Sequence, residues 1–135
     1  MYIRDNQPAA KPFVILERDF HSSFMLFGEL HRLNGNLTGD LLHTYNVLHT
    51  VLNQPCTKPK LRIWIDTPVD TCYERTTRRQ QSGDEAISLQ YITELHAQHE
   101  IWFNTLPRSE VRRIDGTRSI RQIVSDVKHI IRHEL

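Results

Sequence analysis

Short apolar runs along this sequence alternate with segments in which hydrophobic residues recur at helical spacing. One continuous apolar run and two short segments that contain large apolar residues predict three strands that are buried on both faces. They span residues 13–16, 61–66 and 111–114. The first two helices are predicted over residues 22–33 and from a cap at Asp40 to a position before Pro55. Buried strands that alternate with helices are typical of a parallel α/β sheet, which would be narrow with three strands.

The later helices carry clear boundary signals. Thr67 suits the N-cap of the helix after the second strand, Pro68 its first position and Asp70 its third, where a carboxylate can reach free N–H groups. A long helix capped by Ser88 follows. The last predicted helix spans residues 119–133, and its apolar face consists of Ile120, Ile123, Val127 and Ile130.

The composition describes an ordinary globular chain. With 135 residues, 39% hydrophobic and 24% charged, it can form one domain with a modest core. We expect that domain to span residues 13–135, after a flexible polar arm of residues 1–12 that contains two prolines. A net charge of +1 gives no general sign of nucleic-acid or membrane binding, so an anion site must come from local arginines.

Neither the cysteines nor the histidines form a recognisable metal motif. Cys56 and Cys72 are expected to be reduced thiols, which favours a cytoplasmic location. No apolar run could span a bilayer and no signal peptide is evident; a mitochondrial location is the alternative if a further N-terminal part exists. Two histidine pairs have helical spacing but no third ligand, so no metal site is expected. They are His96 with His99 and His129 with His133.

Polar residues follow two of the predicted strands directly. In open parallel sheets, ligands gather at the carboxyl ends of strands, which here carry Glu17-Arg18 and Asp115-Gly116-Thr117. The Arg18 guanidinium could form a bidentate fork to a phosphate, with Glu17 holding it in place. A structural salt bridge at a strand end explains the same residues equally well.

An arginine cluster precedes an acidic loop. Arg75 and Arg79 share one helix face by their spacing, so the two like charges favour an anion between them, such as a triphosphate. A solvated basic face is the commoner explanation of such a cluster. The adjacent loop of Gly83, Asp84 and Glu85 adds context, because its acids can reach a sugar hydroxyl or pair back with the arginines.

Taken in this order, the motifs resemble the C-terminal part of the deoxynucleoside kinases. That family includes deoxycytidine, deoxyguanosine and mitochondrial-type thymidine kinases, with insect and viral relatives. The resemblance runs from about Phe13 to the C-terminus and is continuous from Thr67 to Phe103. It rests on Glu17-Arg18, TPVDTCYER, the arginine cluster, the acidic loop, the SLQYITELHAQHEIW helix and a short strand that ends in aspartate.

The resemblance implies catalytic and phosphate-binding roles for five residues. Glu17 and Arg18 match the family's ER motif, whose arginine lies at the 5′ end of the nucleoside beside the incoming phosphate. Arg75 and Arg79 match lid arginines that grip the ATP phosphates, and Arg78 belongs to the same cluster. These residues are therefore the expected catalytic and lid groups.

It also implies contacts to the sugar and to adenine. Asp84 stands where the family has a glutamate that binds the 3′-hydroxyl of deoxyribose, and Glu85 would replace it if the loop were shifted by one residue. Asp115 and Gly116 lie in the region of the adenine-binding loop. Any sugar selectivity is therefore expected in the acidic loop.

The sequence departs from the family pattern in several places. Gln81 replaces a third lid arginine, and Ser23 stands where deoxycytidine-preferring members have an aspartate that reads the base. No GxxxxGK[ST] phosphate-binding loop (P-loop) is present. In the family, the P-loop strand lies between the counterparts of residues 13–16 and 61–66, so both predicted strands would lack their shared neighbour.

The resemblance thus implies a truncated α/β fold of P-loop-kinase type, with about three parallel strands and five helices. The implied activity is transfer of the γ-phosphoryl group of ATP to the 5′-hydroxyl of a deoxynucleoside in DNA precursor salvage, dependent on Mg²⁺ in the complete enzyme and absent from the isolated chain. A thymidylate-type nucleoside monophosphate kinase fragment is one alternative. A non-catalytic remnant that binds nucleotide or a partner is another. The expected partners are deoxynucleoside, ATP and a second copy through the helices, with no nucleic acid or membrane.

Overall fold

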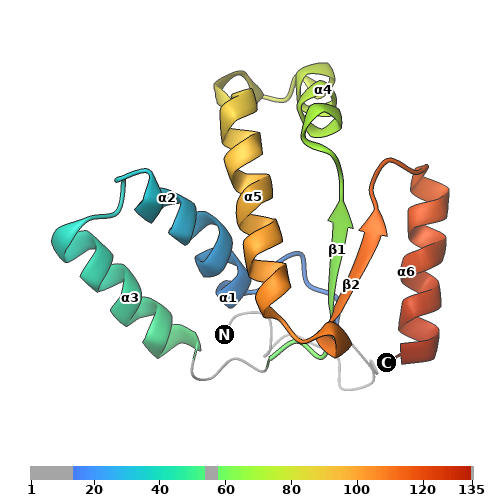
Figure 1. Cartoon of the computed structure of the whole chain (residues 1–135), viewed down its shortest axis with the longest axis horizontal. Helices are drawn as coiled ribbons and strands as arrows, with labels where there is room; N and C mark the ends of the chain where they lie inside the picture. The colour runs from blue at the N-terminus through green and yellow to red at the C-terminus, as the bar shows by residue number, and fades with distance from the viewer. Residues whose placement is uncertain (1–13, 54–57, 135) are drawn as a thin grey trace. The chain divides into compact units, whose positions relative to one another are not determined.

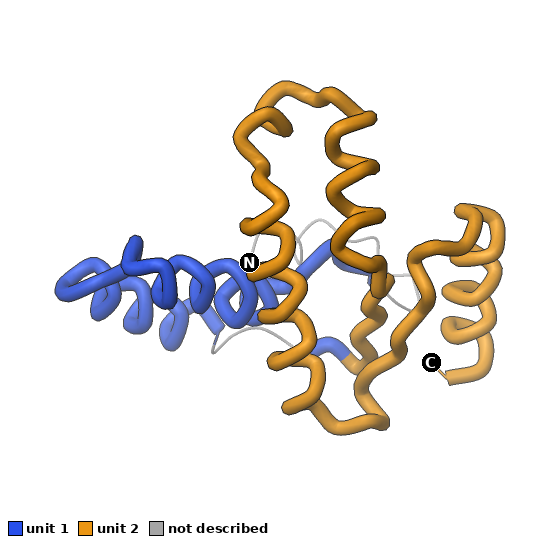
Figure 2. The backbone as a smooth tube through the Cα atoms, turned by 45° about the horizontal axis from the view of Figure 1, so that its top comes forward, with its two compact units in different colours: residues 1–59 blue, residues 60–135 orange. Residues whose placement is uncertain are grey.

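A computed structural model describes residues 14–53 and 58–134 of the chain. It divides into two compact units, Met1–Pro59 and Lys60–Leu135, which Figure 2 shows in different colours. The predicted arm of residues 1–12 and the predicted loop around Cys56 lie outside the described residues.

The first helix of unit 1 is continuous through three segments, α1 (Phe20–Ser23), the π-helical η1 (Phe24–Gly28) and α2 (Glu29–Leu33). It begins two residues before the predicted start because Asp19 forms a capping box. The Asp19 carboxylate accepts from the Ser22 amide at 2.6 Å, and the Ser22 hydroxyl accepts from the Asp19 amide at 3.0 Å. The helix ends at Asn34, and Gly35 adopts a left-handed φ of +73°, as the sequence predicted for this boundary.

An aromatic stack joins this helix to α3 (Gly39–Asn53). The Phe24 ring lies over His49 with a centroid separation of 3.7 Å and over Tyr45 at 5.1 Å. Gly28 makes room for this contact, since a Cβ there would lie 2.4 Å from the Tyr45 hydroxyl. His21 Nδ1 and His49 Nε2 are 3.2 Å apart. Burial, with a smaller contribution from His21, lowers the pKa of His49.

The start of α3 corrects the prediction of an Asp40 cap. The helix already includes Gly39, and the Leu42 amide donates to the Thr38 carbonyl at 3.3 Å, so Asp40 lies inside the first turn. An acid in the first turn still interacts favourably with the helix dipole. The end at Asn53 agrees with the predicted stop before Pro55.

The structure does not contain the strand that was predicted over residues 13–16, as far as residues 14–16 are described. They form no regular structure, and Val14, Ile15 and Leu16 are 51%, 70% and 46% exposed. Phe13, the first residue of that predicted strand, lies outside the described residues. An apolar run becomes a strand only where a neighbouring strand satisfies its backbone groups, and within the described residues no strand pairs with residues 14–16.

Unit 2 is built on a parallel pair of strands, which confirms the predicted α/β class. β1 (Arg62–Asp66) pairs with β2 (Val111–Asp115) in a register that sets Arg62 opposite Val111 and Asp66 opposite Asp115. The connection contains α4 (Val69–Arg79) and α5 (Leu89–Thr105), which lie side by side, and α6 (Ile120–Glu134) packs beside β2 (Figure 1). Two short 3₁₀ helices complete the unit, η2 (Asp84–Ala86) and η3 (Arg108–Glu110).

The core of unit 2 is aromatic on one face of the strand pair. Trp64 of β1 is buried and stacks on Phe103 at 4.9 Å and on His99 at 5.7 Å, both from α5. Ile130 of α6 is also buried, as its predicted apolar face requires, whereas Ile120 at the start of that face is 81% exposed. The predicted face therefore holds along the helix except at its first residue.

The start of α4 differs by one residue from the prediction. Pro68 is the N-cap, with φ −53° and ψ 145°, and its carbonyl accepts from the Cys72 amide at 2.9 Å. Thr67 is therefore outside the helix, and Asp70 is its second residue. The predicted Ser88 cap of α5 is confirmed, because its hydroxyl accepts from the Tyr91 amide at 3.1 Å.

The described helices are short. The longest, α5, has 17 residues and therefore a length of about 25 Å. Within residues 14–53 and 58–134, no helix combines the length and apolar character that crossing a bilayer requires.

Candidate functional site

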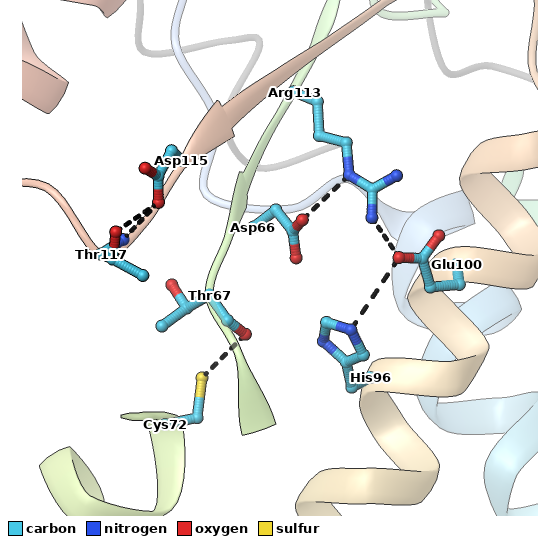
Figure 3. A network of polar contacts seen from close by, with 8 residues as sticks. All are labelled: Asp66, Thr67, Cys72, His96, Glu100, Arg113, Asp115 and Thr117. Carbon is cyan, nitrogen blue, oxygen red and sulfur yellow. Dashed lines mark hydrogen bonds and ion pairs between the residues drawn. The ribbon is translucent and has the colours of Figure 1, made fainter. Parts of the chain in front are cut away.

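The carboxyl ends of β1 and β2 meet in unit 2. The parallel register places Asp66 opposite Asp115 (Figure 3). The Gly116 amide donates to the Asp66 carbonyl at 2.6 Å. Thr67 and Thr117 continue the two strands at this edge. The sheet edge at which parallel folds bind ligands is thus formed by two short polar segments.

Gly116 fits this edge because it has no side chain. A Cβ atom there would lie 1.9 Å from Thr67 Oγ1 and 2.8 Å from the Asp66 carbonyl oxygen, closer than atoms can approach. Gly116 is itself buried. The close approach of the two backbones therefore explains the glycine without any ligand.

Gly116→Ala is expected to lower the free energy of unfolding by about 1–3 kcal/mol, because an added methyl group must displace packed atoms. Urea denaturation of the full chain measures this loss. Thr67→Ala removes the nearest atom, so adding it to Gly116→Ala should restore part of the stability. An unchanged midpoint for Gly116→Ala would contradict the close packing of this turn.

The turn after β2 is ordered by Asp115. Its Oδ1 accepts from the Thr117 amide at 2.8 Å and from the Thr117 hydroxyl at 2.7 Å. These two hydrogen bonds favour the charged form and lower the pKa of Asp115. The region matched to the adenine loop is therefore a turn held by its own side chains.

Arg75 connects α4 to this turn. Its Nη1 donates to the Gly116 carbonyl at 2.9 Å, across 41 positions of sequence. Among the described residues, its other guanidinium nitrogens have no hydrogen-bond partner. The structure thus brings the predicted lid arginine and the predicted adenine-loop glycine together.

Arg79 and Asp84 form a bidentate ion pair, called the Arg79–Asp84 clasp below. Arg79 Nε donates to Oδ2 at 2.9 Å and Nη2 to Oδ1 at 2.7 Å, while the Gln81 amide donates to Oδ2 at 3.0 Å. The hydrogen bond from Arg79 is the main reason that the pKa of Asp84 is lowered. The side chains are 57% and 10% exposed, so the acid is largely covered. Of the two alternatives for this loop, the acid pairs back with an arginine.

Arg78 and Glu85 have different surroundings from the clasp. Arg78 is exposed, lines an open hollow with Tyr73 and Leu89, and has no ion-pair partner within the described ranges. The Glu85 carboxylate accepts from the Gly83 amide at 2.9 Å. The three arginines of α4 therefore differ: Arg75 donates to a carbonyl, Arg78 is exposed, and Arg79 forms an ion pair with Asp84.

Glu17 and Arg18 belong to unit 1 and do not pair. Arg18 has a left-handed φ of +61°, and its guanidinium lies 4.7 Å from the centre of the Phe27 ring. In the part of the chain that the structure describes, Glu17 makes no hydrogen bond or ion pair. This corrects the expectation that Glu17 holds Arg18. An exposed ion pair gains little free energy, so the aromatic face is a competitive partner for the cation.

A polar network that the sequence did not reveal joins β1, β2 and α5 (Figure 3). Arg113 Nε donates to Asp66 Oδ2 at 3.0 Å, and its Nη2 donates to Glu100 Oε1, which also lies 3.9 Å from His96 Nε2. The Arg113 guanidinium also lies 4.3 Å from the centre of the Trp64 ring. The i, i+4 spacing of His96 and Glu100 was the one available sequence signal.

The same residues contain a set of metal-ligand atoms. Asp66, His96 and Glu100 offer atoms within 4.8 Å of one another, and the described ranges contain no other such group of three. Arg113 already bridges the two carboxylates and supplies their countercharge. Mg²⁺ prefers octahedral oxygen ligands and keeps several waters, so this group does not fit it.

Several kinases are similar to this chain in sequence. The sequence profile described as deoxynucleoside kinase matches residues 2–134. The thymidine kinase of Ictalurid herpesvirus 1 is 28% identical over 85 residues, which are 63% of this chain and 34% of the relative. Human mitochondrial thymidine kinase 2 is 26% identical over 103 residues, or 76% and 39%. The putative kinase protein 143R of Invertebrate iridescent virus 6 is 28% identical over 125 residues, or 93% and 63%. The chain thus spans between about a third and two thirds of the length of these relatives.

Proposed function

Because this chain belongs to the deoxynucleoside kinase family, we propose that it forms the lid and sugar-binding part of a kinase that transfers the γ-phosphoryl group of ATP to the 5′-hydroxyl of a deoxynucleoside. The observation that carries the proposal is the Arg79–Asp84 clasp. It sets a cation suited to phosphate beside an anion suited to a sugar hydroxyl, directly after the helix that follows β1.

The three arginines of α4 would act on the phosphates of ATP. Arginine forks match phosphate geometry and stabilise the charge that develops during transfer. Arg79 and Arg78 extend from the last turn of α4, whereas Arg75 uses one nitrogen on the Gly116 carbonyl and has others to offer. We therefore assign phosphate binding chiefly to Arg79 and Arg78, and to Arg75 a link between the lid and the 115–117 turn.

Arg18 would act at the 5′ end of the nucleoside, with Glu17 beside it. Cation–π contacts at exposed sites are weak, about 0.5–1 kcal/mol. The contact to Phe27 is therefore easily exchanged for a charge-assisted hydrogen bond to phosphate. The exposed position of Glu17 leaves its carboxylate available for the same site.

Mg²⁺ is proposed as the usual companion of ATP in this reaction, where it neutralises phosphate charge. The one group of three candidate ligands in the described ranges does not fit it, because Arg113 occupies that group. We therefore propose that Mg²⁺ enters with the phosphates of ATP and assign it no ligand among the described residues.

A non-catalytic, nucleotide-binding role is the second candidate function. It is supported by the absence of any GxxxxGK[ST] in this sequence, whose glycines are scattered at 28, 35, 39, 83 and 116. Phosphoryl transfer depends almost entirely on positioning and electrostatic stabilisation, and the P-loop supplies much of both. The relatives named above are nucleoside kinases or a putative kinase, which favours that class over thymidylate-type enzymes.

The isolated chain is expected to form no deoxynucleoside monophosphate above background when incubated with ATP, Mg²⁺ and the four deoxynucleosides. A fusion in which the P-loop-bearing part of a family kinase precedes this chain, called the completed kinase below, is expected to turn over. Chromatographic detection of the monophosphates measures both. Turnover by the isolated chain would point to another phosphate site, and a folded but inactive fusion would favour the non-catalytic role.

The base, the assembly and the location are proposed more broadly. Two relatives are thymidine kinases by name, and Ser23 is half-buried on the first helix, so we assign no particular base to the nucleoside.

A homodimer through helices is supported by α3, whose exposed apolar residues are Leu41, Val47, Leu48, Val51 and Leu52. Analytical ultracentrifugation of the purified chain distinguishes monomer from dimer. For location we propose the cytoplasm, with the mitochondrion as the alternative supported by a mitochondrial relative and decided by cell fractionation.

A further inference from the structure

We propose that Arg79 and Asp84 each occupy the place of the other's ligand, so that phosphate binding at Arg79 releases Asp84 to the sugar and the two substrates bind cooperatively. This inference rests on the proposed function, because it takes the phosphate role of Arg79 and the sugar role of Asp84 from it. It goes further by coupling the two sites through one ion pair. The clasp is the resting, self-occupied state of the lid.

The geometry sets the Asp84 carboxylate and phosphate in competition for Arg79. Arg79 uses its Nε and Nη2 edge on the carboxylate, which is one of the two edges at which a guanidinium can hold a phosphate by two hydrogen bonds. Asp84 in turn receives three hydrogen bonds, from these two nitrogens and from the Gln81 amide, and only 10% of its side chain is exposed. A sugar hydroxyl therefore reaches Asp84 only after the guanidinium has moved away.

The loop between the two residues can accommodate such a movement. Gln80 ends α4 in a left-handed conformation with φ +50°, and Gly83 has φ +96° just before Asp84. Glycine adopts such angles at no steric cost, while a non-glycine residue pays a conformational penalty for them. The strain at Gln80 is offset in the resting state by the contacts of the clasp.

The strength of the clasp suits a contact that opens. Arg79 is 57% exposed, and ion pairs with such exposure contribute little because water and salt screen them. A triphosphate carries several negative charges and can displace a single carboxylate from Arg79. By linkage, a phosphate ligand that releases Asp84 raises the affinity for the sugar that binds Asp84. The bound sugar raises the affinity for phosphate by the same factor.

The resting pair can be observed directly in the full chain. Inorganic triphosphate serves as the probe, and NMR follows the Arg79 Nε–H signal together with the carboxyl carbon of Asp84 as a function of pH. In the free chain the hydrogen bond from Arg79 lowers the pKa of Asp84. Triphosphate is expected to shift the Arg79 signal and to raise the pKa of Asp84, because the ionised carboxylate loses its partner.

A mutant cycle separates competition from simple charge. Asp84→Asn is expected to tighten triphosphate binding by about two- to fivefold, because it frees Arg79. Glu85→Gln is the matched control, since it removes the same charge from the same loop but its carboxylate pairs with the Gly83 amide and not with an arginine. With Arg79→Gln in the chain, Asp84→Asn should have no more effect than Glu85→Gln.

The outcomes distinguish this inference from the proposed function. If triphosphate shifts Arg79 but Asp84→Asn and Glu85→Gln act alike, the coupling is wrong and the phosphate role of the lid stands. If triphosphate shifts no arginine of α4 at millimolar concentration, the phosphate role is wrong and the coupling falls with it. An unchanged Asp84 pKa in the presence of bound triphosphate also overturns the coupling alone.

Discussion

Arg79→Ala and Arg18→Ala are each expected to lower the kcat of the completed kinase by about 10²–10³-fold. Both guanidiniums are proposed to contact phosphate oxygens, and such contacts strengthen as negative charge develops on the transferring group. Neither side chain belongs to a buried core, since Arg18 lies over Phe27 and Arg79 over the loop that follows α4. Steady-state kinetics with saturating ATP measures the effect on kcat separately from binding.

The control variant for this prediction must replace an arginine that makes no ion pair or hydrogen bond within the described residues. Arg112 is unsuitable, because it forms an ion pair with Glu134 and donates to the carbonyls of Val111 and Arg108. Arg132 on the exposed side of α6 has no such contact in the described ranges, so Arg132→Ala should leave kcat unchanged. Equal losses for Arg18, Arg79 and Arg132, with equal losses of thermal stability, would assign the effect to folding and not to the site.

Local signals explain which elements the sequence predicted well. The short segments that form β1 and β2, the Ser88 cap and the end of the first helix before Asn34 each depend on a few adjacent residues. The helix starts were less accurate: Asp40 lies two positions and Pro68 one position from the predicted place. Several polar residues at a helix start can accept the same amide hydrogens, so composition alone does not select among them.

The strand predicted over residues 13–16 was wrong for a non-local reason. Residues 14–16 have the apolar character of a buried strand, but β pairing depends on a neighbour that is distant in sequence. In this chain the run instead lies exposed and irregular. The same sequence pattern therefore predicts a strand only when the partner strand is also present.

The contacts of the candidate site also divide into a local one, which the sequence suggested, and long-range ones, which it did not. The Arg79–Asp84 clasp spans five positions, and its pairing was one of two alternatives that the sequence offered. The contact between Arg75 and the Gly116 carbonyl spans 41 positions, and the contact between Arg113 and Asp66 spans 47. Both depend on the parallel register of β1 and β2, which becomes known only once the strands are paired.

Asp84→Asn is expected to raise the KM of the completed kinase for a deoxynucleoside by about 10- to 100-fold, the effect of losing a hydrogen bond to a charged group. The loss should be specific to the 3′-hydroxyl. A 2′,3′-dideoxynucleoside has no such group, so its KM should change little. The KM for ATP should stay the same or fall, because the asparagine no longer holds Arg79. Initial-rate measurements with both nucleosides give all three values.

Glu85→Gln completes the comparison, because a shift of the loop by one residue would exchange the two acids. In the structure, Glu85 accepts from the Gly83 amide, whereas Asp84 is the acid held by Arg79. We therefore expect Glu85→Gln to change the KM for both nucleosides by a similar, small factor. If Glu85→Gln alone discriminated between the two nucleosides, the sugar contact would belong to Glu85. If neither variant discriminated, the acidic loop would have no role in sugar recognition, and Asp84 would serve only to hold Arg79.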